Sequence, residues 1–169
     1  MTEIRAAIPE DALAVARVHV RSWQAAYRGL IPQAYLDSLK PEVWAAKYGF
    51  QRTDPERPTT LVAVDGDGIR GLAMTGPYRG DDLTDVVELL AIYADPQHWG
   101  AGVGRLLAAA AREQMRSDGF TEAALWVLDG NVRARRFYER DGWVLDGARR
   151  TKTIAGAELD EVRYRRALA

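Results

Sequence analysis

The sequence predicts a single α/β domain whose mixed sheet carries helices on both faces. Two observations predict it. Strand-like and helix-like patterns alternate along the whole chain, which is typical of a sheet covered by helices. The 169 residues also fall in the size range of one domain, and no internal repeat, low-complexity tract or linker-like shift in composition divides them.

The first segment, residues 1–56, is predicted to form one strand followed by helices. Residues 2–7 have the pattern of a short strand. Residues 8–29 carry apolar side chains at helical spacing, with a proline near the start and a glycine at the end. Two further proline-initiated segments, 31–39 and 41–52, predict shorter helical pieces on the same side of the domain.

Residues 57–94 are predicted to form the centre of the sheet. The segments 59–65 and 69–79 flank a Gly-Asp-Gly sequence that is typical of a hairpin turn. Residues 85–94 are apolar and β-branched, as in a buried strand. The most loop-like stretch of the chain, 51–59, precedes them.

Two segments complete the alternation. In residues 95–141 we expect a long helix, a strand and a second helix, at 102–118, 122–128 and 131–141. In residues 142–169 we expect two strands, at 142–151 and 158–166. The resulting order of elements implies a mixed sheet.

Composition excludes several classes of protein. With no cysteine, the chain has no disulfides and no thiolate chemistry. Its two histidines, His19 and His98, stand beside no carboxylate cluster, so we expect no metal site. A formal net charge of -1 gives no broad attraction to nucleic acid or to a membrane surface. Because no membrane-spanning or signal-like apolar run is found, we expect a cytoplasmic protein.

A glycine-rich turn precedes the long helix. Gly100, Gly102 and Gly104 lie where better helix formers would be favourable. The start of a helix leaves N–H groups without partners and carries the positive end of the helix dipole. Glycines let an anion approach those donors closely, so the turn predicts a phosphate site, most simply for a pyrophosphate.

Known phosphate-binding patterns narrow this prediction. A P-loop requires a lysine after the glycines, and none follows. A dinucleotide-binding turn requires a third glycine where Arg105 stands. The pattern Q-x-x-G-x-G, formed by Gln97, Gly100 and Gly102, fits better than either.

With this pattern the chain resembles the GNAT superfamily of N-acetyltransferases, which bind acetyl-coenzyme A (acetyl-CoA). The resemblance rests on "DPQHWGAGVGRLL", the strand "LWVL" and "GNVRARRFYERDGW", in that order. It implies a twisted, mostly antiparallel central sheet and acetyl-CoA as cosubstrate. It is also compatible with a homodimer.

The same resemblance assigns coenzyme-binding residues by position. The pyrophosphate would lie on the glycine turn, the pantetheine would bond to the backbone of the preceding strand, and Asn131 would touch the pantetheine. Arg105 would replace an arginine that the family often has where this chain has Trp99. The complete set is Ile92, Ala94, Gln97, Gly100, Ala101, Gly102, Val103, Gly104, Arg105 and Asn131.

Acetyl transfer to an amine needs a proton acceptor for the amine, donors for the oxyanion and a proton for the leaving thiolate. We expect Glu88 to be the base and backbone N–H groups near Ile92 to hold the oxyanion. Tyr138, which the resemblance places near the thioester sulfur, would protonate the thiolate. Asn131 and Tyr138 are seven residues apart, so they share one helix face.

Plainer roles remain open for these residues. The glycines could form only a tight turn, and Asn131 could be a helix N-cap. Tyr138 could be a core aromatic, and Glu88 a solvated carboxylate at a strand edge.

The first helix and the loop after it are expected to wall the acceptor pocket. We predict substrate-binding roles for Trp23, Tyr27 and Arg28, with Arg28 placed to bind an acceptor carboxylate. Trp23 could equally be core packing. The acidic segment 79–85 could instead attract a cationic amine.

Two functions remain. The chain is either an N-acetyltransferase acting on a small amine or peptide amine by direct attack, or a non-catalytic module that binds acyl-CoA for regulation. Neither the acceptor nor a preference for longer acyl chains follows from the sequence.

Overall fold

The computed structural model describes residues 1–50, 58–66 and 68–168. The strands are β1 (Glu3–Ala6), β2 (Thr59–Asp65), β3 (Gly68–Pro77), β4 (Val87–Ala94), β5 (Glu122–Leu128), β6 (Val144–Ile154) and β7 (Ala157–Ala167). The helices are α1 (Ala12–Ala26), α2 (Gln33–Ser38), α3 (Pro41–Ala45), α4 (Val103–Ser117) and α5 (Val132–Arg140), with short 3-10 turns η1 (Pro9–Asp11) and η2 (Pro96–His98).

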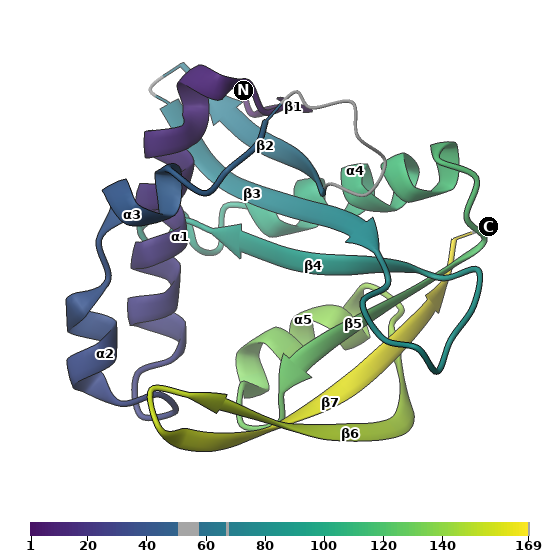
Figure 1. The fold of residues 1–169 in the computed structure, drawn as a ribbon. Coiled ribbons are helices and arrows are strands. Elements are labelled where there is room, and N and C mark those ends of the chain that lie inside the picture. The colour runs from purple at the N-terminus through teal and green to yellow at the C-terminus, as the bar shows by residue number, and fades with distance from the viewer. Residues whose placement is uncertain (51–57, 67, 169) are drawn as a thin grey trace.

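The strands form one sheet in the order β1-β2-β3-β4-β5-β7-β6 (Figure 1). Neighbouring strands pair antiparallel except β4 and β5, which are parallel. The predicted mixed, mostly antiparallel sheet is therefore confirmed. The position of β7 between β5 and β6 did not follow from the order of elements.

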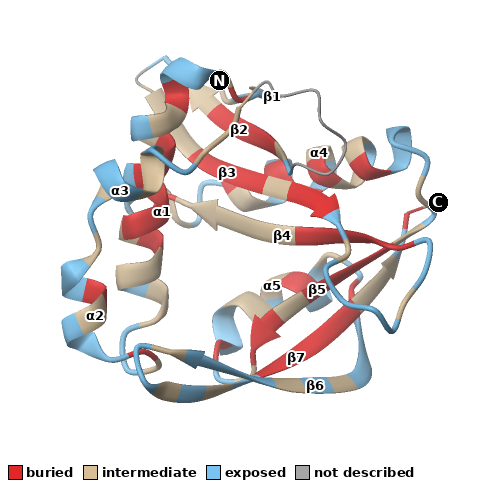
Figure 2. Cartoon of the chain, in the orientation of Figure 1, coloured by how far each residue is buried: buried red, intermediate tan, exposed pale blue. Residues whose placement is uncertain are grey.

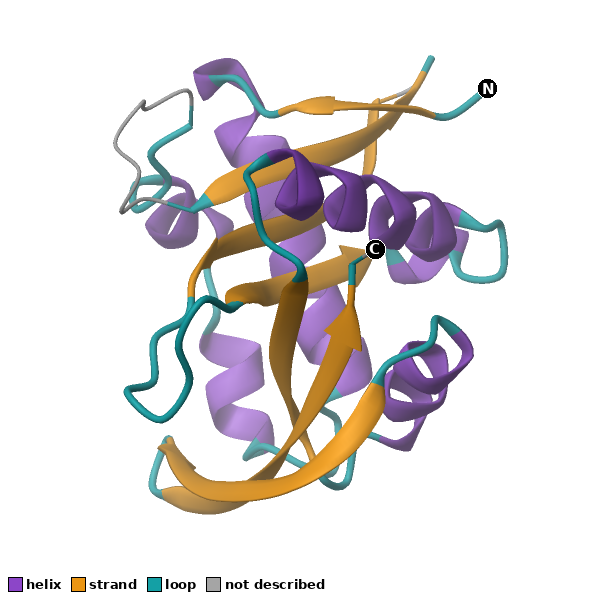
Figure 3. Ribbon diagram, turned by 90° about the vertical axis from the view of Figure 1, so that its right-hand side faces the viewer, coloured by secondary structure: helices purple, strands orange, loops and turns teal. Residues whose placement is uncertain are grey.

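Helices pack on both faces of the sheet (Figure 3). Successive strand residues point to opposite faces, so Val62 and Leu72 contribute to a core with α1, while Ala63 and Ala73 contribute to a core with α4. Figure 2 shows the buried residues gathered along the inner strands and largely absent from β6.

The helix α4 buries a single stripe of side chains. Val103, Leu107, Ala111 and Met115 are spaced four residues apart and are each at most 4% exposed. That spacing keeps them on one face of the helix. Packing of this stripe fixes the N-terminal end of α4 against the sheet.

The strands β4 and β5 separate soon after they begin. They pair only at Val87↔Ala123 and Glu88↔Ala124, whereas β4 continues along β3 as far as Ala94. Figure 1 shows the two strands diverging, and the view of Figure 3 has the same splay. The facing edges beyond the pairs therefore leave a gap in the ladder of the sheet.

A β-bulge lies in β4 beside this gap. Met74 pairs with Ala91 and Thr75 pairs with Leu89, so Leu90 has no partner in β3. A bulge leaves its extra residue outside the ladder and increases the local twist of the strand. The bulge thus occurs in the part of β4 that leaves β5.

The predicted elements agree with the observed ones apart from their ends, except that the predicted helix 41–52 is observed only as α3 (Pro41–Ala45), with no helix in residues 46–50. The predicted helix 8–29 begins as η1 and continues as α1, and the C-terminal strands are longer than expected because they meet in a tight turn at Ala155 and Gly156, both with positive φ. Most of the predicted loop 51–59 lies outside the described residues, as does the middle residue of the predicted Gly-Asp-Gly turn. Among the described residues, no helix is long and apolar enough to span a membrane.

Candidate active site

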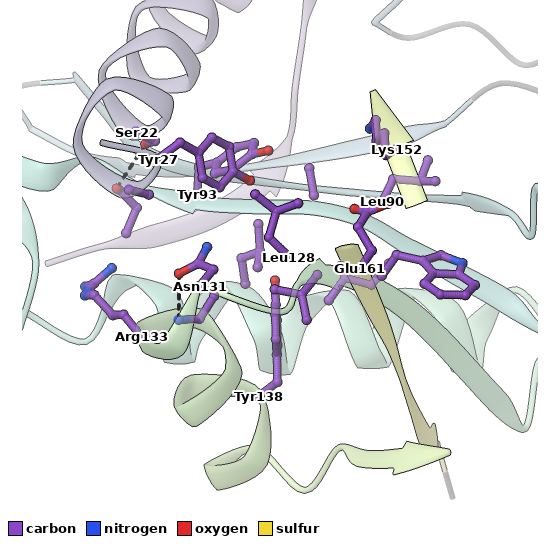
Figure 4. Close-up of a pocket in the computed structure, with 18 of the residues that line it drawn as sticks. Ser22, Tyr27, Leu90, Tyr93, Leu128, Asn131, Arg133, Tyr138, Lys152 and Glu161 are labelled. Atoms are coloured by element: carbon purple, nitrogen blue, oxygen red, sulfur yellow. Dashed lines mark hydrogen bonds between the residues drawn. The ribbon is translucent and has the colours of Figure 1, made fainter. Parts of the chain in front are cut away.

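Two adjoining cavities occupy the space where β4 and β5 separate. The coenzyme-side cavity, about 500 Å³, runs along the start of α4 and one side of α5. The acceptor-side cavity, about 190 Å³, lies between β4, β5, β7 and α1 (Figure 4). They share the wall residues Ile92, Ala94, Trp99, Arg133, Ala134 and Tyr138. The two cavities therefore adjoin at these residues, and together we call them the groove.

The glycine turn lines the coenzyme-side cavity. Gly100 and Gly102 have φ of +85° and +83°, a backbone conformation that strongly favours glycine. Within the described part of the chain, the N–H groups of Val103, Gly104 and Arg105 make no hydrogen bond, and Gly102 provides no side-chain cap. The donors that a phosphate would need are thus exposed at the cavity wall.

Gly104 has a different reason to be glycine. A Cβ added there would lie 3.2 Å from Cε2 of Phe137, which packs against α4 from α5. The third glycine is therefore explained by close packing of two helices. The phosphate prediction rests on Gly100, Gly102 and the unpaired donors.

Basic side chains surround the same cavity. Arg105 and Arg140 line it, and the guanidinium of Arg133 stacks 3.5 Å from the centroid of the Trp99 ring. Burial lowers the pKa of Arg133 from its ordinary value. Trp99 stands where an arginine was expected, and it supports an arginine from α5 at that point.

The backbone edge of β4 is only partly available. Ile92 lines both cavities. The carbonyl of Ala94 already accepts hydrogen bonds from Ser22 Oγ at 3.2 Å and from Trp99 Nε1 at 2.9 Å. Because a carbonyl oxygen has two lone pairs, Ala94 has little capacity left to accept a bond from a ligand.

Tyr138 stands where the two cavities meet. It is 9% exposed, and Figure 4 shows its side chain extending from α5 with the hydroxyl directed into the acceptor-side cavity. Burial raises the pKa of Tyr138 well above its ordinary value, so the hydroxyl stays protonated at neutral pH. The residue can donate a proton there.

Asn131 has the capping role that its sequence context allowed. Its Oδ1 accepts a hydrogen bond from the N–H of Ala134 at 3.2 Å and caps α5. Asn131 also lines the acceptor-side cavity, so its amide nitrogen is on the wall of the groove while its oxygen holds the helix.

Glu88 and Glu161 are two buried carboxylates on strands that border the groove. Glu88 is 1% exposed in a central strand, so the solvated, strand-edge alternative is wrong. Both of its oxygens accept bonds from Arg79, including one from Nη2 at 2.7 Å, and it lines neither cavity. Glu161, on β7, is 7% exposed and lines the acceptor-side cavity. Its Oε1 accepts a bond from Arg150 Nε at 2.7 Å.

The predicted acceptor residues occupy three different environments. Tyr27 lines the acceptor-side cavity, and burial raises its pKa well above the ordinary value. Trp23 donates a hydrogen bond to Tyr93 Oη and packs among aromatic rings away from both cavities. Arg28 is exposed and lines neither cavity.

Gln97 and Ala101, which were predicted to bind the coenzyme, are also exposed and do not line the coenzyme-side cavity.

Among the described residues, no group of three or more His, Cys, Asp or Glu side chains is placed to hold a metal ion.

Comparison with known proteins identifies the family. The acetyltransferase (GNAT) family matches residues 20–143. The chain belongs to the GNAT family of acetyltransferases. Its sequence is similar to an uncharacterized N-acetyltransferase, YuaI, of Bacillus subtilis, with 33% identity over 132 residues that cover 78% of this chain and 74% of the relative. The predicted class of enzyme, an acetyltransferase, is thereby confirmed.

Solved GNAT structures show the same fold. YncA from Salmonella typhimurium, solved with acetyl-CoA, matches with a TM-score of 0.75 and 20% identity, covering 99% of this chain and 94% of that one. PaiA N-acetyltransferase from Thermoplasma acidophilum, solved with coenzyme A, matches with a TM-score of 0.69 and 22% identity, covering 95% of this chain and 98% of that one.

Several residues of this groove were missed by sequence reasoning. Arg150 and Glu161 are cross-strand partners in the β6–β7 hairpin, and Arg79 comes from a distant segment that reaches the same cavity only in the folded protein. Arg133 stacks on Trp99, a contact that the sequence pattern does not indicate. Hydrophobic alternation gave no signal for Glu161, because burial does not alternate there: the four residues from Glu161 to Tyr164 are all buried.

Proposed function

We propose that this GNAT protein transfers an acetyl group from acetyl-CoA to a primary amine by direct attack within a ternary complex. The observation that carries the proposal is the groove formed by the two adjoining cavities. It has unpaired helix N–H groups at one end, a buried carboxylate at the other, and a protonated tyrosine between them.

The coenzyme-side cavity suits the phosphates of the cosubstrate. The free N–H groups of Val103, Gly104 and Arg105 lie at the positive end of a fifteen-residue helix, which favours bound anions. Arg133, held by Trp99, and Arg105 add positive charge at the same wall. The pantetheine would then follow the edge of β4 at Ile92, while Asn131 approaches it from α5.

The thioester would lie beside the bulge of β4. We expect backbone N–H groups at Leu90 to Ile92, which line the cavity beside the bulge, to bind the oxyanion that forms when an amine attacks the carbonyl carbon. As the carbon–sulfur bond breaks, the thiolate takes the proton of the Tyr138 hydroxyl. The nitrogen, positively charged after the attack, loses a proton as the amide forms, and this proton balances the one that Tyr138 gives to the thiolate.

The nucleophile must be a neutral amine. The ordinary pKa of an alkyl amine is about 10.4, so its proton has to be removed at neutral pH. We assign this step to Glu161, whose Oε2 has no hydrogen-bond partner among the described residues. We assign to Glu88, the base expected from the sequence, the positioning of Arg79, because both Glu88 oxygens are already occupied.

Steady-state kinetics test this proposal. With acetyl-CoA and an amine varied together, direct attack predicts intersecting double-reciprocal lines for thiol release. Parallel lines would indicate an acetyl-enzyme instead. Coenzyme binding without amine-dependent thiol release, across a broad panel of amines, would favour the alternative of a non-catalytic acyl-CoA-binding module.

A further inference from the structure

The acceptor-side cavity is lined by more cations than carboxylates. Arg79, Arg150 and Lys152 contribute positive charge to its wall, and Glu161 is the carboxylate that lines it. Glu88 lies behind Arg79 and offsets one further charge. Within the described residues, an excess of positive charge therefore faces the space that the amine must enter.

Each of the three cations has unused donors. The Nε and Nη2 groups of Arg79 donate hydrogen bonds to Glu88, and Nη1 has no partner among the described residues. The Nε group of Arg150 donates a hydrogen bond to Glu161. Neither terminal nitrogen of Arg150 donates a hydrogen bond to any described residue. Lys152 makes no ion pair with any described residue. These donors remain available to a ligand.

Arg150 is also held in position. Its guanidinium stacks 4.3 Å from the centroid of the Trp126 ring while its Nε is bound to Glu161. A guanidinium fixed in this way binds a carboxylate with little further loss of side-chain freedom. Figure 4 shows Glu161 and Lys152 on the same side of the cavity, away from Arg133.

The acidic segment 79–85 contributes no carboxylate to the cavity wall. Asp82 accepts hydrogen bonds from Arg163 and Tyr78 and does not line the cavity. This removes the main reason to expect a polyamine or a lysine side chain in the pocket. The exposed Arg28 likewise does not line the acceptor-side cavity.

The cavity is small. Its volume of about 190 Å³ lies below the range of roughly 300–1,000 Å³ that is typical of sites for drug-sized ligands. An acceptor of the size of an amino acid suits this space better than a large aminoglycoside-like molecule does.

We infer that the acceptor is a small primary amine that carries an acid group, and that Arg79, Arg150 and Lys152 bind this acid group while Glu161 faces the amine. The inference rests on the proposed transferase function and specifies its substrate class. Reaction with such an acceptor releases free coenzyme A and an N-acetyl acid. The ammonium group gives one proton to Glu161 before the attack, and the nitrogen loses a second proton as the amide forms. The thiolate takes one proton from Tyr138, so one proton is released in the overall reaction.

The test measures thiol release from acetyl-CoA with the protein amino acids, each paired with its C-terminal amide, and with spermidine. The amino group of an amide is less basic than that of the parent acid, so more of it is neutral at a given pH. Slower turnover of an amide therefore cannot be attributed to protonation of its amine. We expect at least one acid to exceed its amide by about tenfold or more in kcat/KM.

Lys152→Gln tests the site itself, with Lys40→Gln as control, because both lysines are exposed and Lys40 lines neither cavity. We expect Lys152→Gln to raise the KM for the acid about fivefold, with no change for its amide or for acetyl-CoA. Lys40→Gln should leave all three values unchanged. Equal turnover of acids and amides, a preference for spermidine, or no selective effect of Lys152→Gln would overturn the inference.

Failure of the transferase proposal would be recognised separately. If no amine releases thiol, the same acids and amides are titrated by calorimetry into the protein saturated with coenzyme A. Preferential binding of an acid, weakened by Lys152→Gln, would support the acid-group site without catalysis. Absence of that preference would overturn it.

Discussion

Tyr138 is the residue whose chemistry depends most on its surroundings. Removing its hydroxyl by Tyr138→Phe leaves the ring packed between α5 and the sheet but removes the proton donor for the thiolate. We expect kcat to fall by about 10²-fold, the lower end of the range for general acid–base catalysis, with an unchanged dissociation constant for acetyl-CoA. Turnover at the unmodified rate would show that another group or a water protonates the thiolate.

Substitution of the two buried carboxylates, Glu161 and Glu88, should distinguish a role in catalysis from a role in stability. Glu161→Gln should lower kcat by about 10²-fold because the amine loses its proton acceptor. Glu88→Gln should mainly lower the free energy of unfolding, by about 2 kcal/mol, because it weakens the bonds from Arg79 to a buried carboxylate. Paired measurements of turnover and urea unfolding check both variants. The reverse pattern would indicate that Glu88, and not Glu161, is the catalytic base.

At the scale of elements, the turn before α4 combines a special backbone with a binding surface. Gly102→Val places a branched side chain in a left-handed backbone and at the cavity wall. The matched control is Gly119→Val at the other end of α4, where φ is +99° and an added Cβ also meets nothing within 4 Å. Both should lose about 1–2 kcal/mol of stability from backbone strain.

Coenzyme affinity distinguishes the two glycine variants. Gly102→Val should weaken acetyl-CoA binding at least tenfold by calorimetry, while Gly119→Val should bind normally. Equal affinities in the two variants would mean that the turn does not contact the cosubstrate.

Element type was predictable because local signals agreed with the tertiary structure. The spacing of Val103, Leu107 and Met115 predicted α4, and the asparagine at 131 predicted the start of α5. The separation of β4 from β5 was not predictable, because the apolar pattern of β4 continues past the last paired residue, Glu88. The hydrophobic periodicity of a strand is the same whether or not its residues are paired with a neighbouring strand.

At the scale of the whole molecule, strand order decided which side chains meet. Arg150 and Glu161 reach the groove only because β7 inserts beside β5. Adjacent strands in sequence usually pair, but a long hairpin can also place its second strand inward, and local sequence does not distinguish these arrangements. The coenzyme-binding role of residues 97–105 could therefore be inferred from one contiguous motif and stays a prediction, whereas no single motif brings together the residues of the acceptor-side wall.

Global stability should depend on pH through His19. This residue is 8% exposed among Trp23, Trp44, Tyr48 and Tyr93, and burial lowers its pKa from 6.5 to about 4. Between these values the unfolded chain binds a proton that the folded chain does not, so stability falls as the pH falls. From pH 7 to pH 5 this loss should be about 2 kcal/mol.

Urea unfolding at the two pH values checks this prediction. His19→Gln should lose about 2 kcal/mol less than the parent protein on acidification. His98→Gln, which changes the other histidine of the chain, should retain the full dependence. The same acid sensitivity in His19→Gln would assign it to carboxylates.

The most direct test of the central claim is a crystal structure of the protein with acetyl-CoA. We predict pyrophosphate oxygens within about 3 Å of the N–H groups of Val103, Gly104 and Arg105, and the thioester between β4 and β5 beside Tyr138. A complex with the phosphates bound elsewhere, or with the thioester outside that gap, would contradict the account.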